Sequence, residues 1–258
     1  MSATPNQFFW YELMTTEPAA AEAFYRAVVG WTAVKPGGPH DYTVLETGGI
    51  GVAGLMQIPD EAVARGAKPA WVGYIHVEDV DAHVKRVVAA GGAEYRPAED
   101  IPDVGRFAVV ADPQGAVFLM MTPEPSMSRP PVPPAAIGTV GWHELLAADG
   151  PSALEFYVKT FGWTKTGAHP MGPMGDYLLF GTGEEPFGFG GMMTKPPQVP
   201  APFWTYYFYV DSVTAAVERI KAAGGTVVNG PMEVPSGDWI VQGLDPQGVW
   251  FALLSAGR

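Results

Sequence analysis

Hydrophobic positions along the chain follow two alternating spacings, and this pattern predicts strands separated by helices. Residues 8–14 carry the apolar and aromatic side chains typical of a strand, and Pro18 then begins a helix that ends at Gly30. Phe24 and Val28 lie four residues apart, so one face of this helix is expected to pack on a sheet. The same succession of strand, helix and further strands is expected twice in each half of the chain.

A second helix is predicted over residues 80–90, with Gly91 supplying the left-handed residue that ends it. His83 stands beside Lys85 and Arg86, and we expect it to be solvated. The apolar stripe of this helix is expected at Val80, Val84, Val87 and Val88. The strands expected in the first half are residues 8–14, 41–47, 50–57, 71–78, 106–111 and 116–121.

Nearly every motif occurs twice, about 130 residues apart, which marks a duplicated domain because solenoid repeats are much shorter. What differs between the two halves cannot be required by their common fold. The repeated pairs are Trp10-Tyr11-Glu12-Leu13 with Trp142-His143-Glu144-Leu145, Phe24-Tyr25 with Phe156-Tyr157, Asp41-Tyr42 with Asp176-Tyr177, and Asp112-Pro113-Gln114-Gly115 with Asp245-Pro246-Gln247-Gly248.

This duplication predicts two domains, at residues 1–121 and 140–258, joined by a linker at 122–139. Residues 122–136 belong to neither repeat, and six of them are proline. Such a segment is expected to be an extended, semi-rigid connector. A ligand for a proline-binding module is the alternative.

Composition narrows the classes of partner and chemistry. Charged residues make up only 16% of the 258, and the net charge is −12, which argues against binding to nucleic acid or to an anionic membrane. The chain has no cysteine, so thiolate metal sites, cysteine nucleophiles and disulfides are excluded. There is neither a leader-like N-terminus nor an apolar run of membrane-spanning length, and we expect a cytoplasmic protein.

Three motifs, taken in order, carry a family resemblance. They are Trp-x-Glu-Leu, a helix with Ala-x-x-Phe-Tyr that ends in Gly-Trp, and Asp-Pro-x-Gly before the final strand. Both halves resemble the vicinal oxygen chelate superfamily, which includes glyoxalase I, bleomycin-resistance proteins and extradiol dioxygenases. The resemblance implies an α+β fold of two tandem domains, each of paired βαβββ modules forming a cupped mixed sheet with helices outside. Whether a cup forms within one half or from modules exchanged between halves stays open.

The resemblance also indicates where metal-using members place their ligands, usually His, Glu, His and Glu. A divalent ion needs such nitrogen or carboxylate donors. The residues of this chain at the matching positions are not such donors, so we expect neither a metal nor another cofactor. A one-residue shift in register would, however, turn His143 rather than Trp142 into the cup. The matching positions are Trp10, Met56, Val72 and Leu119 in the first half, and Trp142, Met192, Thr205 and Ala252 in the second.

Alternation along strands predicts the side chains that face each cup. They form an apolar, aromatic surface with one carboxylate per half, which is typical of a small-molecule pocket. Glu12, His76, Glu144 and Tyr209 are the candidates for acid–base chemistry. The full ligand-binding set is Trp10, Glu12, Val72, Tyr74, His76, Leu119 and Met121 in the first half, and Trp142, Glu144, Thr205, Tyr207, Tyr209, Trp250 and Ala252 in the second.

These residues also have purely structural explanations. The tryptophans can fill space, Glu12 and Glu144 can pair with arginine or lie at a solvated rim, and His76 can be a wall residue. The glycine-rich tracts 48–54 and 188–191 lack the lysine of a phosphate-binding loop, and strand bends account for them better.

Two classes of function follow. The first is a protein that binds a small, planar or aromatic molecule in metal-free cups, with a resistance or sequestration role. The second is a glyoxalase-like lyase or isomerase that uses Glu, His and Tyr as acid–base groups, and a metal-dependent dioxygenase fits less well. The expected partner is a small-molecule ligand, and the chain is expected to be a monomer that forms an internal pseudo-dimer, or a homodimer.

Overall fold

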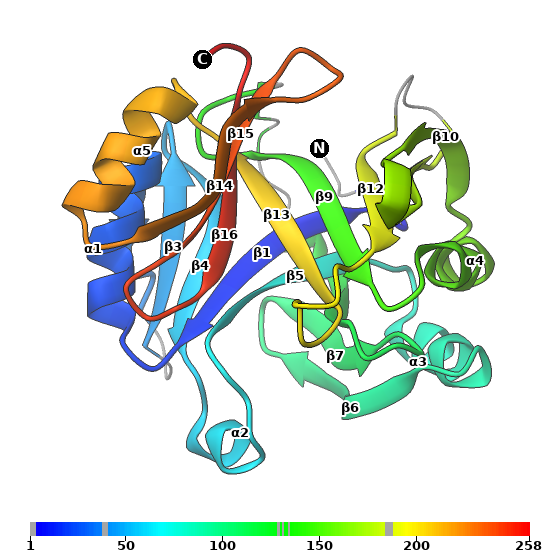
Figure 1. Cartoon of the computed structure of the whole chain (residues 1–258). Helices are drawn as coiled ribbons and strands as arrows, with labels where there is room; N and C mark the ends of the chain where they lie inside the picture. The colour runs from blue at the N-terminus through cyan, green and yellow to red at the C-terminus, as the bar shows by residue number, and fades with distance from the viewer. Residues whose placement is uncertain (1–3, 38–40, 128–129, 131, 134, 184–187) are drawn as a thin grey trace. The chain divides into compact units, whose positions relative to one another are not determined.

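A computed structural model describes residues 4–37, 41–127, 130, 132–133, 135–183 and 188–258 (Figure 1). Within these ranges the strands form two eight-stranded sheets, one from each half of the chain. Both sheets mix parallel and antiparallel pairs, with β1 parallel to β4 and β5 parallel to β8 in the first. The α+β fold with two repeats of paired βαβββ modules is therefore confirmed.

The first half supplies one sheet in the order β2-β3-β4-β1-β5-β8-β7-β6. Each strand expected here is present within a few residues, whereas the short β2, the helix α2 and the edge strand β6 were not expected. The elements are β1 (Phe8–Thr15), α1 (Pro18–Val29), β2 (Thr32–Val34), β3 (Tyr42–Thr47), β4 (Ile50–Gln57), α2 (Asp60–Ala64), β5 (Ala70–His76), α3 (Val80–Ala89), β6 (Ala93–Ile101), β7 (Gly105–Ala111), β8 (Val117–Pro123) and η1 (Pro125–Met127).

The second half repeats this order as β10-β11-β12-β9-β13-β16-β15-β14. Its elements are β9 (Val140–Ala147), α4 (Gly150–Phe161), β10 (Thr164–Pro170), η2 (Gly172–Met174), β11 (Asp176–Gly181), β12 (Gly190–Thr194), β13 (Phe203–Tyr209), α5 (Val213–Ala222), β14 (Thr226–Glu233), β15 (Trp239–Leu244) and β16 (Trp250–Ser255).

The chain packs into two compact units that do not coincide with its two halves. Unit 1 consists of residues 1–9, 73–129 and 142–205, and unit 2 consists of 10–72, 130–141 and 206–258. Each unit therefore combines a module of one half with a module of the other. Within unit 2, α1 and α5 lie side by side, as α3 and α4 do within unit 1 (Figure 1).

A buried hydrogen-bond network joins the two modules of unit 2. The Tyr25 hydroxyl donates to Asp245 Oδ2 at 3.2 Å and accepts from Trp71 Nε1 at 2.9 Å. The other carboxylate oxygen of Asp245 accepts from the backbone N–H groups of Gln247 and Val249, both at 2.9 Å. Burial raises the pKa of the Asp245 carboxyl, and the backbone hydrogen bonds oppose that rise.

Unit 1 contains the same network built from the opposite copies of the motifs. The Tyr157 hydroxyl donates to Asp112 Oδ2 at 3.3 Å and accepts from Trp204 Nε1 at 3.1 Å. The backbone N–H groups of Gln114 and Ala116 donate hydrogen bonds to the other oxygen of the Asp112 carboxylate, Oδ1. The repeated Phe-Tyr and Asp-Pro-Gln-Gly motifs therefore meet across the halves, and each tyrosine reaches the aspartate of the other half.

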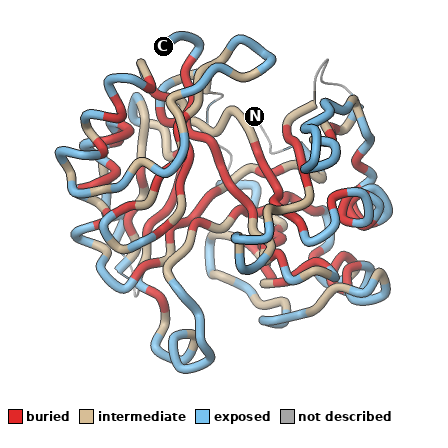
Figure 2. The backbone as a smooth tube through the Cα atoms, in the orientation of Figure 1, coloured by how far each residue is buried: buried red, intermediate tan, exposed pale blue. Residues whose placement is uncertain are grey.

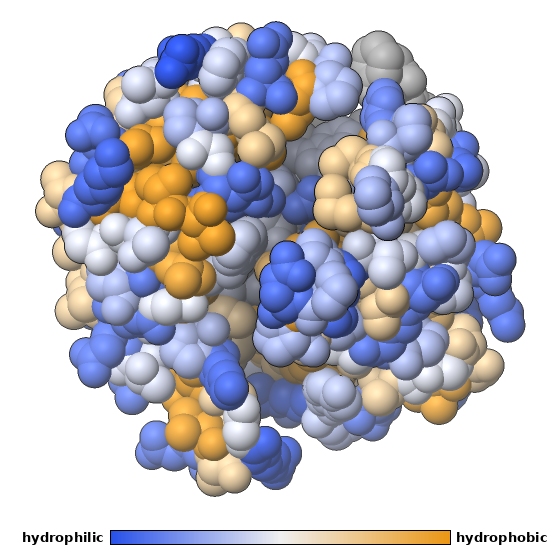
Figure 3. Space-filling model, in the orientation of Figure 1, coloured by the Kyte–Doolittle hydropathy of each residue, from blue (hydrophilic) through white to orange (hydrophobic). Residues whose placement is uncertain are grey.

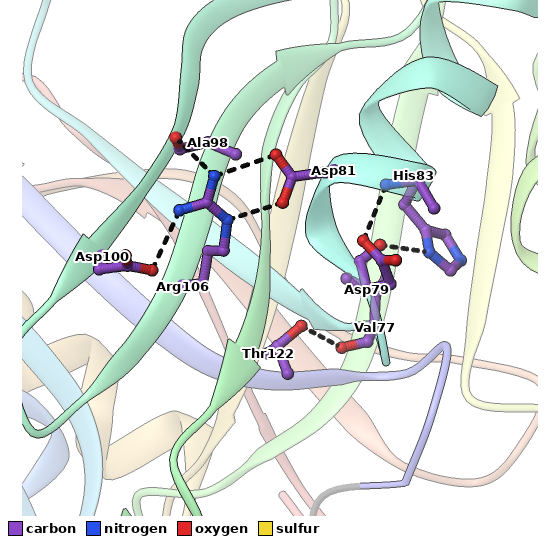
Figure 4. A network of polar contacts seen from close by, with 9 residues as sticks. Val77, Asp79, Asp81, His83, Ala98, Asp100, Arg106 and Thr122 are labelled. Carbon is purple, nitrogen blue, oxygen red and sulfur yellow. Dashed lines mark hydrogen bonds and ion pairs between the residues drawn. The ribbon is translucent and has the colours of Figure 1, made fainter.

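Helix α3 corrects two expectations about its faces. His83 is only 7% exposed, stacks on Phe161 at 6.0 Å between ring centroids, and donates from Nδ1 to the Asp79 carbonyl (Figure 4). Val88 is 50% exposed. The apolar stripe thus continues through His83 rather than Val88, because α4 covers that side of α3 within unit 1. Burial lowers the pKa of His83.

The outer side of α3 is tied to the β6–β7 hairpin by Arg106 (Figure 4). Its guanidinium donates two hydrogen bonds to the Asp81 carboxylate, at 2.7 and 3.0 Å, and a third to Asp100 at 3.0 Å. These groups are solvated, so the arrangement orients the hairpin more than it stabilises the unit.

The starts of α1 and α4 differ in their chemistry. The Asp149 side chain accepts from Ser152 N and caps α4, whereas the Glu17 side chain makes no capping hydrogen bond at α1.

The end of the predicted linker is attached within unit 2, because the carbonyls of Ile137 and Gly138 accept from Thr47 Oγ1 and Trp31 Nε1. Linker residues 128–129, 131 and 134 lie outside the described residues.

Buried residues concentrate in the strands, and exposed ones on the outer sides of α1 and α5 (Figure 2). Side chains such as Leu13, Leu45 and Leu55 are at most 1% exposed and form the side of the first sheet that faces α1.

Across the described ranges, the helices are too short or too polar for any of them to span a bilayer.

Replacing Tyr25 by Phe should lower the free energy of unfolding by about 1–3 kcal/mol, because it leaves the Trp71 N–H and an Asp245 oxygen buried without their partner. Urea denaturation measures this change. Tyr95→Phe is the matched control, since Tyr95 is 55% exposed. A Tyr25→Phe variant as stable as Tyr95→Phe would show that the network does not hold the modules together.

Candidate functional site

Strand β1 presents Trp10 and Glu12 on the side opposite Tyr11 and Leu13. Trp10 Nε1 donates to the Tyr42 hydroxyl at 3.0 Å, and that hydroxyl is hydrogen-bonded to Glu12. Burial, and then the negative charge of Glu12, raise the pKa of Tyr42 well above its usual value. The phenol therefore stays protonated and donates to the carboxylate. We call Trp10, Tyr42 and Glu12 the first Trp–Tyr–Glu network.

The second half repeats the arrangement within unit 1. Trp142 Nε1 donates to the Tyr177 hydroxyl at 2.7 Å, and this hydroxyl is hydrogen-bonded to Glu144. Burial and the Glu144 charge raise the pKa of Tyr177 well above its usual value. Trp142, Tyr177 and Glu144 form the second Trp–Tyr–Glu network. In both networks the glutamate is buried and the indole is half-buried.

A glycine makes each network possible. Gly54 on β4 lies between β3 and β1 and pairs with Glu12, and a Cβ on Gly54 would overlap the Tyr42 hydroxyl. Gly191 pairs with Glu144, and a Cβ there would overlap the Tyr177 ring. Bends alone therefore do not explain these two glycines. They let a tyrosine cross a whole strand to reach the carboxylate beyond it.

Tyr42 and Tyr177 were not among the predicted site residues. Two features of the sequence could have indicated them. The Asp-Tyr pair at the start of the third strand occurs in both halves, and so does a glycine on the fourth strand.

His143 lies on the face of β9 opposite Trp142. Its ring stacks on Phe8 with 4.8 Å between centroids and an interplanar angle of 11°, and Nδ1 donates to the Phe189 carbonyl at 2.8 Å. Burial lowers the pKa of His143 to about 4. The imidazole is therefore a neutral part of the unit 1 core, and the one-residue register shift that would have turned it, rather than Trp142, into the cup is absent.

Strands β13–β16 carry the remaining second-half residues of unit 2 on one face. The pairing sets Tyr207 beside Ala252, Tyr209 beside Leu254, and Trp250 beside Leu244. Burial, followed by the charge of Asp238, raises the pKa of Tyr209. Two residues that were not predicted also lie here. Gln242 Nε2 donates to the Tyr207 hydroxyl at 2.5 Å, and Asn229 Nδ2 donates to Gln242 Oε1 at 2.9 Å.

Strands β5–β8 carry the corresponding first-half residues in unit 1. Tyr74 pairs with Leu119 and His76 with Met121. His76 is 9% exposed, its ring edge meets Phe9 at 5.8 Å, and its buried Nδ1 makes no hydrogen bond within the described part of the chain.

Val72 and Thr205 occupy equivalent places in the two repeats. Val72 is half-buried in unit 2, and Thr205 is buried in unit 1. Thr205 Oγ1 makes no hydrogen bond to any described residue.

The donor set does not fit the divalent metal that the fold family uses. Across the described ranges, no three His, Asp or Glu side chains are grouped so as to hold an ion. Glu12 and Glu144 are each hydrogen-bonded to a tyrosine whose hydroxyl also accepts from an indole N–H. No chemical step through a metal is derived from these residues.

A surface groove of about 470 Å³ follows α4 in unit 1. None of the predicted site residues lines it, so its size does not make it the functional site. Its lining consists of Pro151, Leu154, Glu155, Val158, Lys165, Asp176 and Leu178.

Comparison with protein families identifies both halves. Residues 10–121 match the Glyoxalase-like domain, and residues 139–253 match the Glyoxalase/Bleomycin resistance protein/Dioxygenase superfamily. The chain therefore belongs to this superfamily.

Two relatives cover nearly the whole chain. CFP32 of Mycobacterium tuberculosis (strain CDC 1551 / Oshkosh), named as a candidate glyoxylase, is 35% identical over 255 residues, which cover 97% of this chain and 94% of CFP32. The anthracycline biosynthesis protein DnrV of Streptomyces peucetius is 30% identical over 268 residues, which cover 97% of this chain and 93% of DnrV.

Solved structures share the fold at low identity. The Mn(II)-bound glyoxalase from Novosphingobium aromaticivorans superposes with a TM-score of 0.69 at 14% identity, over 98% of this chain and 83% of that one. The 2,3-dioxygenase LapB from Pseudomonas sp. KL28 gives 0.67 at 12% identity, over 99% and 94%.

Replacing Gly54 by Ala should lower the free energy of unfolding by about 1–3 kcal/mol, because the methyl group displaces Tyr42 from Trp10 and Glu12. A double-mutant cycle with Tyr42→Ala, measured in urea, tests the cause. In the Tyr42→Ala background the same change should cost much less. Equal costs in both backgrounds would mean that Gly54 is required for another reason.

His143 should make stability depend on pH. Its pKa is depressed on folding from near 6.5, so the unfolded chain binds the proton more tightly, and stability present above pH 6.5 falls as pH decreases toward 4. Between pH 7 and pH 5 the loss from this residue should be about 2 kcal/mol. His143→Phe should remove most of this dependence in urea denaturation at both pH values, whereas the exposed His169→Gln should not. An unchanged pH dependence in His143→Phe would contradict the assignment.

Proposed function

We propose that the chain binds a small planar molecule on the two faces that carry the Trp–Tyr–Glu networks, and that binding requires no metal. One observation carries this proposal. In each network a half-buried indole is fixed by its N–H beside a buried carboxylate.

The geometry of the network favours stacking. Because the N–H of Trp10 is bonded to Tyr42, the ring is held in one orientation before a ligand arrives. An aromatic face that is already ordered loses little conformational entropy when a planar ring stacks on it. Trp142 and Tyr177 offer the same arrangement in unit 1.

The carboxylates favour a ligand with a cationic or hydrogen-bond-donating group. Glu12 is 5% exposed and Glu144 is 8% exposed, and a buried carboxylate is stabilised by donors and by positive charge. The net charge of −12 also suits a cation. A sequestration or resistance role agrees with the superfamily, and a role in small-molecule biosynthesis agrees with a relative named for anthracycline biosynthesis.

The second candidate function is a lyase or isomerase reaction, as the name of the relative CFP32 suggests. The observation that favours it is His76, which has a buried ring nitrogen without a hydrogen bond in the described chain. Catalysis by His76 would make turnover of an α-oxoaldehyde with a thiol sensitive to His76→Tyr, the residue type of the other half. Turnover unaffected by that change would remove His76 from the reaction.

Binding should be measured by calorimetric titration with 1-naphthylmethylamine in the presence of a chelator. Trp10→Ala combined with Trp142→Ala should weaken binding by about five- to 150-fold, because stacking on an aromatic ring is worth about 1–3 kcal/mol. Trp239→Ala is the control, because Trp239 lies in neither network and contacts Arg258. 1-Naphthylacetate should bind more weakly than the amine. Binding that needs added metal, or that survives loss of both tryptophans, would contradict the proposal.

A further inference from the structure

The outer face of α4 in unit 1 is apolar at positions where the matching helix of unit 2 is charged. Counted from the shared Phe-Tyr pair, Val158 corresponds to Arg26 and Leu154 corresponds to Glu22. On α1, Arg26 and Glu22 form a solvated ion pair at 3.4 Å. On α4, Val158 leaves 41% of its surface exposed. Because the same fold accepts an ion pair at these positions, it does not require the two apolar side chains.

The strand beside α4 differs between the halves in the same direction. Leu178 of β11 lines the groove along α4 together with Leu154 and Val158, and it takes the place of Thr43. The rim differs too, since Asp41 is paired with Lys35 at 2.7 Å in unit 2. Its counterpart Asp176 makes no ion pair with any described residue. The groove thus has an apolar lining and charges that are open to a partner.

Helix α4 forms a ridge between two grooves. Residues 151, 154 and 158 line the groove of about 470 Å³, and residues 152, 156 and 159 line a second groove of about 300 Å³. Glu155 lines both. Figure 3 shows hydrophobic and charged side chains, in orange and blue, next to one another where Figure 1 draws α4. Helices pack with the ridge of one in a groove of the other. Since α4 offers both features, its surface suits a copy of itself.

The charges around the two grooves also favour a second copy. Glu155 and Asp176 are balanced by Lys165 and Lys159, so this surface is locally neutral. Two copies of a chain with a net charge of −12 repel each other least where the facing surfaces are neutral. A strongly cationic partner would be attracted more to the acidic remainder of the chain.

The order of charges along α4 makes the surface complementary to itself. Glu155 and Lys159 are both exposed and lie four residues apart, on one side of the helix. A twofold axis that crosses α4 midway between them sets Glu155 opposite the partner's Lys159, twice in each dimer. A twofold axis also makes the two helices antiparallel.

The open form of the larger groove favours a helix over a small molecule. Glu155, Val158 and Lys165 are exposed, although they line the groove. A small-molecule site encloses most of its ligand, whereas a helix laid into a groove keeps its far side in water.

We propose that two copies of the chain associate through α4 of unit 1, antiparallel and about a twofold axis. Val158 and Leu154 form the apolar centre of the contact, and Glu155 pairs with the partner's Lys159 at its edge. This contact is independent of the proposed ligand binding, because none of the predicted site residues lines either groove.

Sedimentation velocity over a concentration series tests the contact with the full chain. The wild type should be a dimer at high concentration and dissociate on dilution. Val158→Arg installs the residue of the other repeat and should raise the dimer dissociation constant about thirtyfold, equivalent to about 2 kcal/mol, because an apolar contact is lost in both copies. Val34→Arg is the matched control, since Val34 is 42% exposed on β2 of unit 2, and it should leave the constant unchanged.

A charge exchange tests the twofold arrangement. Glu155→Lys and Lys159→Glu, each alone, set like charges opposite each other and should raise the dissociation constant about tenfold. The variant with both changes should return to within about threefold of the wild type, because the opposite charges then face each other again.

Three results would overturn the proposal. They are a wild type that stays monomeric throughout the series, a Val158→Arg dimer as tight as that of Val34→Arg, and a double charge exchange no tighter than the single ones. Urea denaturation accompanies each variant. If Val158→Arg alone unfolds, Leu154→Glu with Val158→Arg replaces it, since this combination reproduces the ion pair that α1 carries.

Discussion

The buried hydrogen bond between a tyrosine of one half and an aspartate of the other is the constraint on which the rest of the structure depends. Tyr25 reaches Asp245 in unit 2, and Tyr157 reaches Asp112 in unit 1. Each aspartate also holds its own turn through two backbone N–H groups, and each tyrosine also accepts from a tryptophan. Losing one partner would leave charged or polar atoms buried in an aromatic core, so this contact stabilises the packing of each module against one from the opposite half.

Because those contacts maintain the fold, the opposite faces of the sheets are available for the ligand binding that we propose. The motifs that form the buried tyrosine–aspartate contacts are the same in both halves. The residues on the opposite faces of the sheets are partly the same and partly different between the halves. The Trp–Tyr–Glu networks are duplicated, each with its own glycine that lets a tyrosine cross a strand. The β5–β8 and β13–β16 faces have diverged, with Val109 against Gln242 and His76 against Tyr209. The two halves thus share one Trp–Tyr–Glu network each and differ in the residues of these other faces.

Much of the fold could be predicted from the sequence, because strand alternation and helix stops are local signals. Alternation placed Trp10 and Glu12 on one face of β1, and the glycine ends of α1 and α4 were visible. The exchange of modules was not predictable, since either tyrosine could pair with either copy of the same turn. Tyr42 and Tyr177 were missed because their role depends on a glycine in a neighbouring strand. Gln242 and Asn229 were missed because strand register brings them together. His83 was misplaced because only the packing of α4 covers it.

A crystal structure of the protein grown with 1-naphthylmethylamine and a chelator tests the central claim most directly. The account predicts ring density stacked on the Trp10 or Trp142 indole, with the amine within hydrogen-bond distance of Glu12 or Glu144. Ring density confined to the groove along α4, or a ligand bound with its amine away from both glutamates, would contradict it.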